Sequence, residues 1–343
     1  MGDRRQFLQS SFAAAGCAAL APLYAPSARA STSLKLVPLV GRLALVEGAA
    51  ANIVVASSGK ELVLVDGGSS VDAKALSKLL DAHYPGQMLR AVFNTHWHWI
   101  QTGFNATARA RGVDVLAHEN TRLWLTTTVH SRWEHKVYPP QPAAALPNRT
   151  FFYGPQQFEF GGSKIDYVHL DPAHTDGDIY VRFPEENVLV VGDVLAPGRY
   201  PIIDAATNGW LGGINGALHT IGEIADANTR LIPGSGPVAG LSQLKEQEEM
   251  GVAVMTAMGQ VYRKGGTFEE FLAAKPTADY DAKFGDPSLF LQVAFDTAWY
   301  QVNPMGGLST GEPMGAGGRP GFGRPPPGRP PAGRPANAGG QGQ

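Results

Sequence analysis

Short runs of apolar residues recur along the middle of the chain. Each run is rich in β-branched or large aliphatic side chains and is bounded by Gly, Asp or Asn, a pattern typical of buried strands. The runs that predict strands are residues 43–48, 52–58, 61–68, 91–95, 114–118, 164–170, 178–183 and 187–194.

Longer segments between and after these runs repeat apolar residues at the spacing that places them on one face of a helix. The predicted helices are residues 70–84, 119–129 and 241–265. Ser70 or Asp72 is a suitable N-cap for the first of them. Strands that first follow one another directly and are then separated by helices predict a layered α/β domain.

The first thirty residues differ from this pattern. Arg4 and Arg5 precede an apolar run of small residues, and Ala-Arg-Ala stands at 28–30, an arrangement that resembles a twin-arginine export signal with its cleavage site. The alternatives are an N-terminal membrane anchor, for which the run is short of the roughly 20 residues needed to span a bilayer, and a lipoprotein modified at Cys17. We expect a periplasmic or secreted protein without stable membrane insertion after the signal is removed.

Cys17 is the only cysteine of the chain. Because it lies inside the predicted signal, the exported protein would have neither disulfides nor thiolate ligands. Any metal ion would therefore be held by His, Asp or Glu.

Residues 306–343 consist mainly of Gly, Pro and Ala, and the tripeptide Gly-Arg-Pro occurs in them four times. Such a composition predicts a disordered tail, because it offers too little apolar surface to offset the entropy of ordering. Its arginines could contact an anionic surface, although a solvated tail also explains them. Residues 31–305 remain as one large domain.

The charge of the chain argues against a nucleic-acid partner. The formal net charge is −2, and seven arginines lie in the two terminal segments, so the central domain is more acidic than the chain as a whole. Nucleic-acid binding depends on basic contacts to phosphate. We expect a small-molecule substrate instead, and the sequence leaves the oligomeric state open.

Ionisable side chains follow three of the predicted strands. His96 and His98 follow the run at 91–95, His174 follows the run at 164–170, and Asp193 ends the run at 187–194. Two residues apart in an extended chain, His96 and His98 would point the same way. Zinc accepts such ligands, and an open coordination position would lower the pKa of its bound water to roughly 7.

Several motifs around these residues occur in a specific order, namely NTHWHW, AHENT, AHTDGD, VLVVGDV and IPGSGPV. Together they resemble the metallo-β-lactamase superfamily over nearly all of residues 35–240. The resemblance implies an α/β fold of the αββα sandwich type, with metal ions in a shallow cleft at one edge of two sheets. It also implies a first metal site made by His96, His98 and His174, with Asp193 as the bridging carboxylate.

The resemblance implies a second metal site as well, but its own ligands are missing. The family has Asp and His where this chain has Ile100 and Gln101, and a further His where this chain has Ser235. Because all three are replaced while the first site is complete, we expect one metal ion. Ile100 cannot act as a base, and Gln101 and Ser235 can offer only hydrogen bonds.

Other ionisable residues of these motifs are expected to be structural. His118 would be buried and hydrogen-bonded, and His169 would face away from the metal. Asp178 would orient ligands rather than bind the metal, and Asp66 would be structural.

Two segments are candidates for contacting the substrate. Residues 126–142, which include Trp133, would form either a lid or an insertion that covers the sandwich. Residues 196–210 follow Asp193, and in them Arg199 could receive an anionic group. The candidate contact residues are Trp99, Trp133, Arg199 and Tyr200, although packing alone would explain Trp99 and its neighbour Trp97.

The first functional hypothesis is a hydrolase that uses one zinc ion to generate hydroxide for attack on an ester, thioester, lactone or lactam. Asp193, as fourth ligand or as partner of the water, and His174 would be its catalytic residues. The second hypothesis is oxygen chemistry on a sulfur compound with a single iron ion, Fe2+, at the same ligands. The third is a binding protein of the cell envelope with a vestigial metal site.

Overall fold

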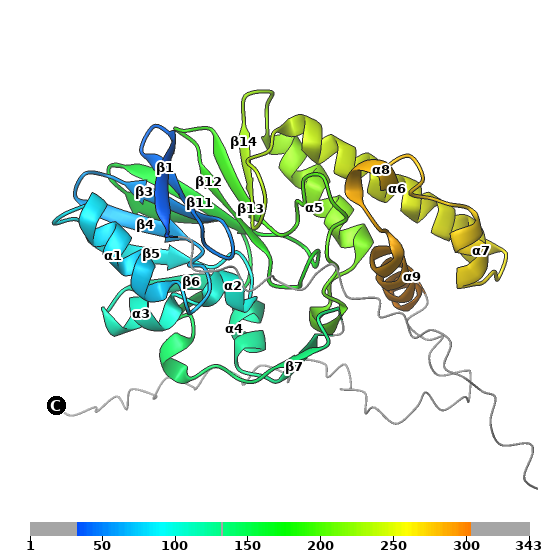
Figure 1. The fold of residues 1–343 in the computed structure, drawn as a ribbon, viewed down its shortest axis with the longest axis horizontal. Coiled ribbons are helices and arrows are strands. Elements are labelled where there is room, and N and C mark those ends of the chain that lie inside the picture. Colours follow the sequence, from blue (N-terminus) through cyan, green and yellow to red (C-terminus); the bar gives the residue numbers. More distant parts are fainter. Residues whose placement is uncertain (1–32, 132, 303–343) are drawn as a thin grey trace, which may run out of the picture. The chain divides into compact units, whose positions relative to one another are not determined.

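Two β-sheets packed face to face form the centre of the protein (Figure 1). The computed structural model describes residues 33–131 and 133–302. The first sheet contains, in spatial order, β1 (Lys35–Val40), β2 (Leu43–Glu47), β3 (Ile53–Ser57), β4 (Glu61–Val65), β5 (Met88–Phe93), β6 (Asp114–His118) and β9 (Arg149–Phe151). The second contains β10 (Gln156–Phe160), β11 (Ser163–His169), β12 (Ile179–Phe183), β13 (Val188–Gly192) and β14 (Arg230–Pro233).

Both sheets are mixed. Strands β1 to β4 are antiparallel neighbours, whereas β4, β5, β6 and β9 pair in parallel. In the second sheet β10 to β13 are antiparallel and β13 pairs with β14 in parallel. A separate hairpin is made by β7 (Val129–Ser131) and β8 (Lys136–Tyr138).

Helices cover the outer faces of the two sheets (Figure 1). The α-helices are α1 (Ala73–His83), α2 (Trp99–Thr102), α3 (Asn105–Ala110), α4 (Glu119–Leu125), α5 (Leu211–Ile224), α6 (Leu241–Arg263), α7 (Phe268–Ala273), α8 (Asp281–Phe284) and α9 (Ser288–Val302). Two 3₁₀ turns lie at Ala143–Ala145 and Ala205–Thr207. The resulting order of layers confirms the predicted αββα sandwich.

The alternation of side chains along each strand explains these layers. In β4, Val63 and Val65 face the core between the sheets, while Leu62 and Leu64 pack on the other face with Leu76 of α1. Successive residues of a strand point to opposite faces. A strand that is apolar at every position is therefore buried on both sides, as its sequence predicted.

All eight predicted strands are present, with ends that differ by a few residues. The helix predicted at 119–129 ends at Leu125. The residues that follow it are β-branched, which disfavours a helix, and β7 begins at Val129. Asp72 is the N-cap of α1, but its carboxylate accepts from Ser69 rather than from the helix. Helix α5 was not predicted, since it has four glycines among its 14 residues and is stabilised by burial against the second sheet.

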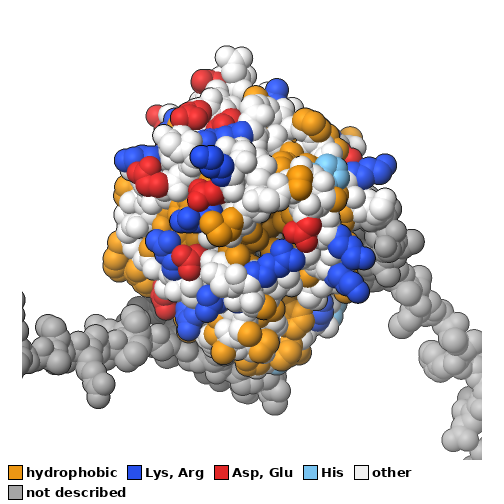
Figure 2. All heavy atoms as spheres, turned by 90° about the vertical axis from the view of Figure 1, so that its left-hand side faces the viewer, with side chains coloured by type: hydrophobic (Ala, Val, Ile, Leu, Met, Phe, Trp, Pro, Cys, Tyr) orange, Lys and Arg blue, Asp and Glu red, His pale blue; other side chains and the backbone are white. Residues whose placement is uncertain are grey.

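The predicted signal at 1–30 and tail at 306–343 lie outside the described residues, so both stay predictions. Within the described ranges, no helix has the length and hydropathy needed to cross a bilayer. On the side of the molecule that carries α1, basic and acidic side chains are interspersed (Figure 2). The expected lack of a nucleic-acid partner also stays a prediction.

Candidate metal centre

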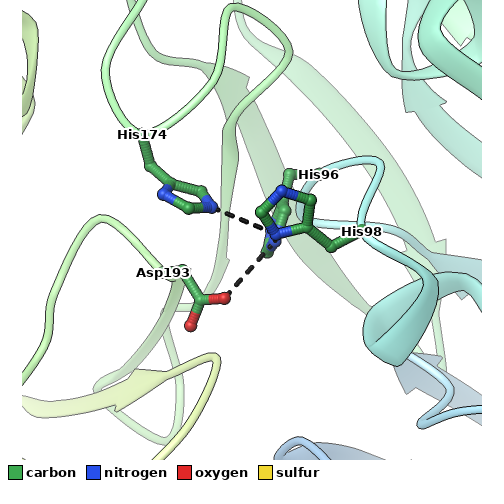
Figure 3. Close-up of side chains that lie close together, drawn as sticks. All are labelled: His96, His98, His174 and Asp193. Carbon is green, nitrogen blue, oxygen red and sulfur yellow. Dashed lines mark hydrogen bonds and ion pairs between the residues drawn. The ribbon is translucent and has the colours of Figure 1, made fainter. Parts of the chain in front are cut away.

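Four side chains from three loops meet at one edge of the sandwich. His96 and His98 lie in the turn between β5 and α2, His174 follows β11, and Asp193 follows β13. Strands β11 and β13 are both antiparallel to β12, so their carboxyl ends lie at the same edge. One ligand atom from each residue lies within 4.8 Å of the others (Figure 3). All four residues are buried.

The three imidazole rings face one another through specific nitrogens. Nε2 of His96 lies 3.1 Å from Nδ1 of His98, and Nε2 of His174 lies 3.3 Å from the same atom. Nε2 of His96 is also 3.4 Å from Oδ2 of Asp193. The rings are nearly perpendicular to one another, so their contact is edge-on, through the nitrogens.

Acceptors outside the cluster determine where two of these rings carry their protons. Nδ1 of His174 lies 2.8 Å from the carbonyl oxygen of Ile202, which can only accept, so this nitrogen must donate. Nε2 of His98 lies 3.0 Å from Oδ2 of Asp204 and donates to that carboxylate. In the neutral rings, Nε2 of His174 and Nδ1 of His98 therefore present lone pairs.

His96 follows the same pattern through a longer chain of contacts. The Thr95 hydroxyl donates to Asp66 at 2.8 Å, and Nδ1 of His96 lies 3.0 Å from that hydroxyl oxygen. When the hydroxyl donates to ionised Asp66, its oxygen accepts from Nδ1 of His96, and Nε2 of His96 then presents a lone pair. Lone pairs of all three rings thus converge on one point.

A cation satisfies this arrangement. Three converging lone pairs have no donor among themselves, and Oδ1 of Asp193 is buried without a hydrogen-bond partner among the described residues. Three imidazoles and one carboxylate are a donor set for zinc, and imidazole also binds iron and other transition metals. The residues therefore fit a metal ion.

Burial and neighbouring groups shift the pKa values of all four residues. Burial lowers the pKa of His96, and burial together with the neighbouring histidines lowers that of His174, so both rings stay neutral. Burial also acts against a charge on His98, but the hydrogen bond and charge of Asp204 outweigh it and raise the pKa. Burial acts against ionised Asp193 as well, yet the basic groups around it, His96 first and Arg199 among the others, outweigh it and lower the pKa.

Residues 46–242, more than half of the chain, match the family described as the Metallo-beta-lactamase superfamily. The chain belongs to the metallo-β-lactamase superfamily.

Curated relatives of this superfamily member align over only part of their length. The chain is 28% identical over 114 residues to the hydroxyacylglutathione hydrolase of Thermosynechococcus vestitus, which covers 33% of this chain and 37% of that protein. It is 26% identical over 141 residues to the 2,4-dinitroanisole O-demethylase subunit alpha of a Nocardioides species, covering 40% of each. The chain thus matches less than half of the length of both relatives.

Solved structures share the fold at lower identity. The metallo-beta-lactamase from Pontibacter korlensis superposes with a TM-score of 0.52 at 17% identity, over 63% of this chain and 99% of that one. The DIM-1 metallo-beta-lactamase gives a TM-score of 0.53 at 17% identity, over 64% and 98%. These similarities show the sandwich and its topology.

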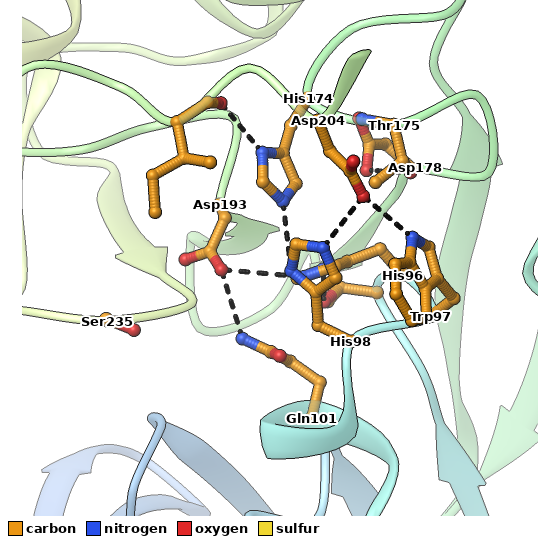
Figure 4. A network of polar contacts seen from close by, with 12 residues as sticks. His96, Trp97, His98, Gln101, His174, Thr175, Asp178, Asp193, Asp204 and Ser235 are labelled. Atoms are coloured by element: carbon orange, nitrogen blue, oxygen red, sulfur yellow. Dashed lines mark hydrogen bonds and ion pairs between the residues drawn. The ribbon is translucent and has the colours of Figure 1, made fainter. Parts of the chain in front are cut away.

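In this superfamily member the three residues at the expected second site make different contacts. Gln101 is fully buried, and its Nε2 donates to Oδ2 of Asp193 at 3.2 Å (Figure 4). Ile100 is 36% exposed, and Ser235 is half-buried with its carbonyl oxygen accepting from Arg199. Gly234 is required beside them, because a Cβ at this position would lie 2.5 Å from Oδ1 of Asp193.

Asp204 is the important residue that the sequence analysis did not identify. Its Oδ2 accepts from His98, from the indole of Trp97 at 3.1 Å and from the Thr207 hydroxyl at 2.8 Å (Figure 4). It is the only acidic residue of the segment 196–210, a signal that could have identified it. Its position against His98, 106 residues away in the chain, follows only from the fold.

The other two predicted carboxylates lie behind the ligands. Asp178 accepts from the backbone and hydroxyl of Thr175, next to His174, and burial raises the pKa of Asp178 to about 6. Asp66 holds Thr95 in the same way, and burial raises its pKa to about 8. Both fix the loop next to a ligand.

The four candidate substrate contacts lie in different surroundings. The Trp133 ring lies 6.1 Å from the His98 ring, and the half-buried Trp99 packs against Tyr138 of the hairpin at 4.9 Å. Arg199 lies near enough to Asp193 to help lower its pKa. Tyr200 is instead buried, with 2% exposure.

The surroundings of Tyr200 belong to the core under α8 and α9. Its hydroxyl donates to Asp281 at 2.6 Å, and its ring stacks on Phe290 at 5.0 Å. Trp133 therefore borders the metal centre, Trp99 packs against the hairpin, and Tyr200 belongs to the core behind the loop.

Proposed function

We propose that the protein is an exported metallo-hydrolase with one zinc ion held by His96, His98, His174 and Asp193. The observation that supports it is the convergence of three histidine lone pairs and a carboxylate on one buried point. The reaction would be hydrolysis of an ester, thioester, lactone or lactam. A zinc ion with an open position would supply a Lewis acid for the carbonyl oxygen and an activated water.

The residues of the chain would provide positioning and proton handling. Asp204 and the Ile202 carbonyl fix the rings of His98 and His174 by accepting from their outer nitrogens. Asp193, kept ionised, has one oxygen held by Gln101 and the other without a partner among the described residues. That free oxygen can accept a hydrogen bond from the attacking water and hold it toward the substrate carbonyl.

The contact of Gln101 supports one ion rather than two. Its amide N–H group donates to Oδ2 of Asp193 and occupies a lone pair of that oxygen which a second, bridged ion would need. The neighbouring Ile100 has no ligand atom. The positions that would hold a second ion thus present a donor and an alkyl group.

The substrate does not follow from the relatives. One is named for hydroxyacylglutathione and the other for 2,4-dinitroanisole, and both align over less than half of their length. The similarity to a hydrolase supports hydrolysis as the reaction. Experiments must decide among esters, thioesters, lactones and lactams. Export is supported by the twin-arginine-like residues 1–30.

The test is the metal content and activity of the full-length chain after expression with its own N-terminus. We expect one equivalent of zinc by mass spectrometry and hydrolysis in a panel of carbonyl substrates. The triple variant Ile100→Asp, Gln101→His and Ser235→His should bind a second equivalent, and the single variant Ile100→Ala serves as the control that should not.

Other outcomes contradict the proposal in different ways. Two tightly bound equivalents in the unmodified chain would overturn the single-ion assignment. One iron ion with oxygen consumption would establish the oxygen chemistry, which the same three imidazoles and carboxylate also suit. A chain without metal or turnover would indicate a binding protein.

A further inference from the structure

One oxygen of Asp204 accepts hydrogen bonds from three side chains. The ring of His98 and the indole of Trp97 both donate to Oδ2, at 3.0 and 3.1 Å (Figure 4), and the Thr207 hydroxyl donates to the same atom at 2.8 Å. The other oxygen accepts from the backbone N–H of Ala206 at 3.2 Å. Asp204 is fully buried, so these donors stabilise its charge in place of water and fix the direction of its carboxylate.

The β7–β8 hairpin holds Trp97 in place. The Trp97 side chain is 1% exposed and belongs to an apolar cluster with Val129 of β7 and Tyr138 of β8. The Tyr138 ring meets the Trp97 ring nearly perpendicularly, with centroids 5.4 Å apart. Ala206 packs against the same cluster. The hairpin therefore covers both the indole that donates to Asp204 and the 3₁₀ turn that follows Asp204.

This chain of contacts ends at a metal ligand. The two nitrogens of the His98 ring move together, so Nδ1 stays directed at the other ligands while Nε2 stays on Asp204. A protein group that holds the outer nitrogen of a histidine orients it as a ligand. Trp97 supplies one of the hydrogen bonds that hold this carboxylate, and the hairpin supplies the packing that holds Trp97.

We propose that Trp97 is a positioning residue of the metal centre, and that the β7–β8 hairpin determines how firmly the ion is held. The effect passes from Tyr138 through Trp97 and Asp204 to His98. The proposal rests on the metal site of the proposed function and is independent of hydrolysis. A ligand that moves Tyr138 away from Trp97 would loosen the ion.

The first experiment compares the zinc affinity of two tryptophan variants with that of the full-length parent, by competition with a chromophoric chelator. Phenylalanine keeps an aromatic ring and has no N–H donor, so Trp97→Phe should lower the affinity about fivefold, less than the loss of a direct partner of a ligand. Trp124→Phe is the matched control and should keep the parent affinity, because the Trp124 indole donates to Asp176 and its ring lies against the same cluster. An unchanged affinity in Trp97→Phe would overturn the proposal.

The second experiment measures the rate of zinc release to excess chelator in variants of the hairpin. Tyr138→Ala removes the ring that packs on Trp97 and should speed release about fivefold. Tyr138→Phe keeps the ring and loses the hydrogen bond to Glu134, so it should restore the parent rate. Val137→Ala, at the adjacent β8 residue with 52% exposure, is the control without effect. Release from Tyr138→Ala at the parent rate would refute the role of the hairpin.

A spectroscopic measurement separates positioning from a general loosening of the fold. In the cobalt(II)-substituted protein, the ring N–H protons of the bound histidines give strongly shifted NMR signals, and Asp204→Asn assigns the signal of His98. Trp97→Phe should shift this signal and speed its exchange with solvent. The ring N–H of His174, which donates to the carbonyl oxygen of Ile202, should not change. Equal changes at both histidines would show a structural role of Trp97 and overturn the proposal.

These measurements also separate the proposal from the proposed function. Zinc binding that responds to the variants as expected, in a protein without hydrolysis, would refute the hydrolase and retain the positioning role. A parent that takes up neither zinc nor cobalt would refute the metal site itself. The ¹⁵N spectra of the histidine rings in the metal-free protein then decide about Trp97. A proton on Nε2 of His98 that moves to Nδ1 in Trp97→Phe would support the positioning role, and the same tautomer in both proteins would overturn it.

Discussion

Two groups of histidines lie at the same edge of the sandwich and differ in how their nitrogens are used. In the metal centre the outer nitrogens of His96, His98 and His174 donate to protein acceptors, so that lone pairs converge inside. The rings of His118 and His169 instead stack in parallel, with centroids 3.6 Å apart.

The nitrogens of the stacked pair are directed outward, to the backbone. His118 accepts from the backbone N–H of Asn120 through Nδ1 and donates to the carbonyl of Phe152 through Nε2. His169 donates to the carbonyl of Asp176. Clustered histidines thus form a metal site only where surrounding acceptors direct the lone pairs to a common point.

The largest effect is expected from removing one ring of each group. His174→Ala should lower metal affinity by more than about 100-fold and should abolish hydrolysis. This loss exceeds the one expected when only a hydrogen-bond partner of a ligand is removed. His169→Ala should leave the metal content unchanged. Metal analysis after dialysis measures both, with circular dichroism as the check of folding, and equal metal loss in the two variants would refute the distinction.

A smaller loss of metal affinity is expected when the carboxylate next to the metal centre, rather than a ligand, is changed. Asp204→Asn keeps an acceptor for His98 but removes the charge, so metal affinity should fall about 10-fold to 100-fold. Asp176→Asn is the matched control, because that carboxylate accepts from Trp124 and Asn208 rather than from a ligand. Competition with a chromophoric chelator measures both affinities, and an unchanged affinity in Asp204→Asn would remove Asp204 from the site.

The smallest effect concerns acid stability. Burial lowers the pKa of His118 to about 4, and the charge of His169 adds to this, whereas the unfolded chain has a pKa near ~6.5. Between these values the unfolded state binds more protons, so the free energy of unfolding should fall as the pH drops from about 6.5 to about 4.

Protonation of Nδ1 would also remove the acceptor that caps α4. His118→Gln should therefore make the free energy of unfolding, measured with urea, less dependent on pH over this interval. A slope identical to that of the parent would show that other groups cause the acid sensitivity.

The cluster of His96, His98, His174 and Asp193 was predictable because each residue lies at or just after the end of a strand whose apolar pattern is clear. The position of a strand end in a layered sheet is fixed by the burial of the strand, so His96, His98, His174 and Asp193 had to lie close to one edge. The residue types at 100, 101 and 235 could also be read directly from the sequence.

The contacts of those replacements were not predictable. Gln101 was expected only to offer hydrogen bonds, and the fold directs its amide to Asp193. Helix α9 and the hairpin of β7 and β8 were not predicted, and both form by packing against the rest of the chain.

The sequence by itself determined a layered α/β domain and the candidate ligands, because both depend on local patterns, while the αββα arrangement was implied by the resemblance of the motifs to the metallo-β-lactamase superfamily. Only the tertiary structure decided how the ligands are oriented and what lies beside them. Asp204 contacts His98 from 106 residues away, and Gln101 donates to Asp193 across 92. Such contacts depend on the path of long loops, which no short segment of sequence specifies.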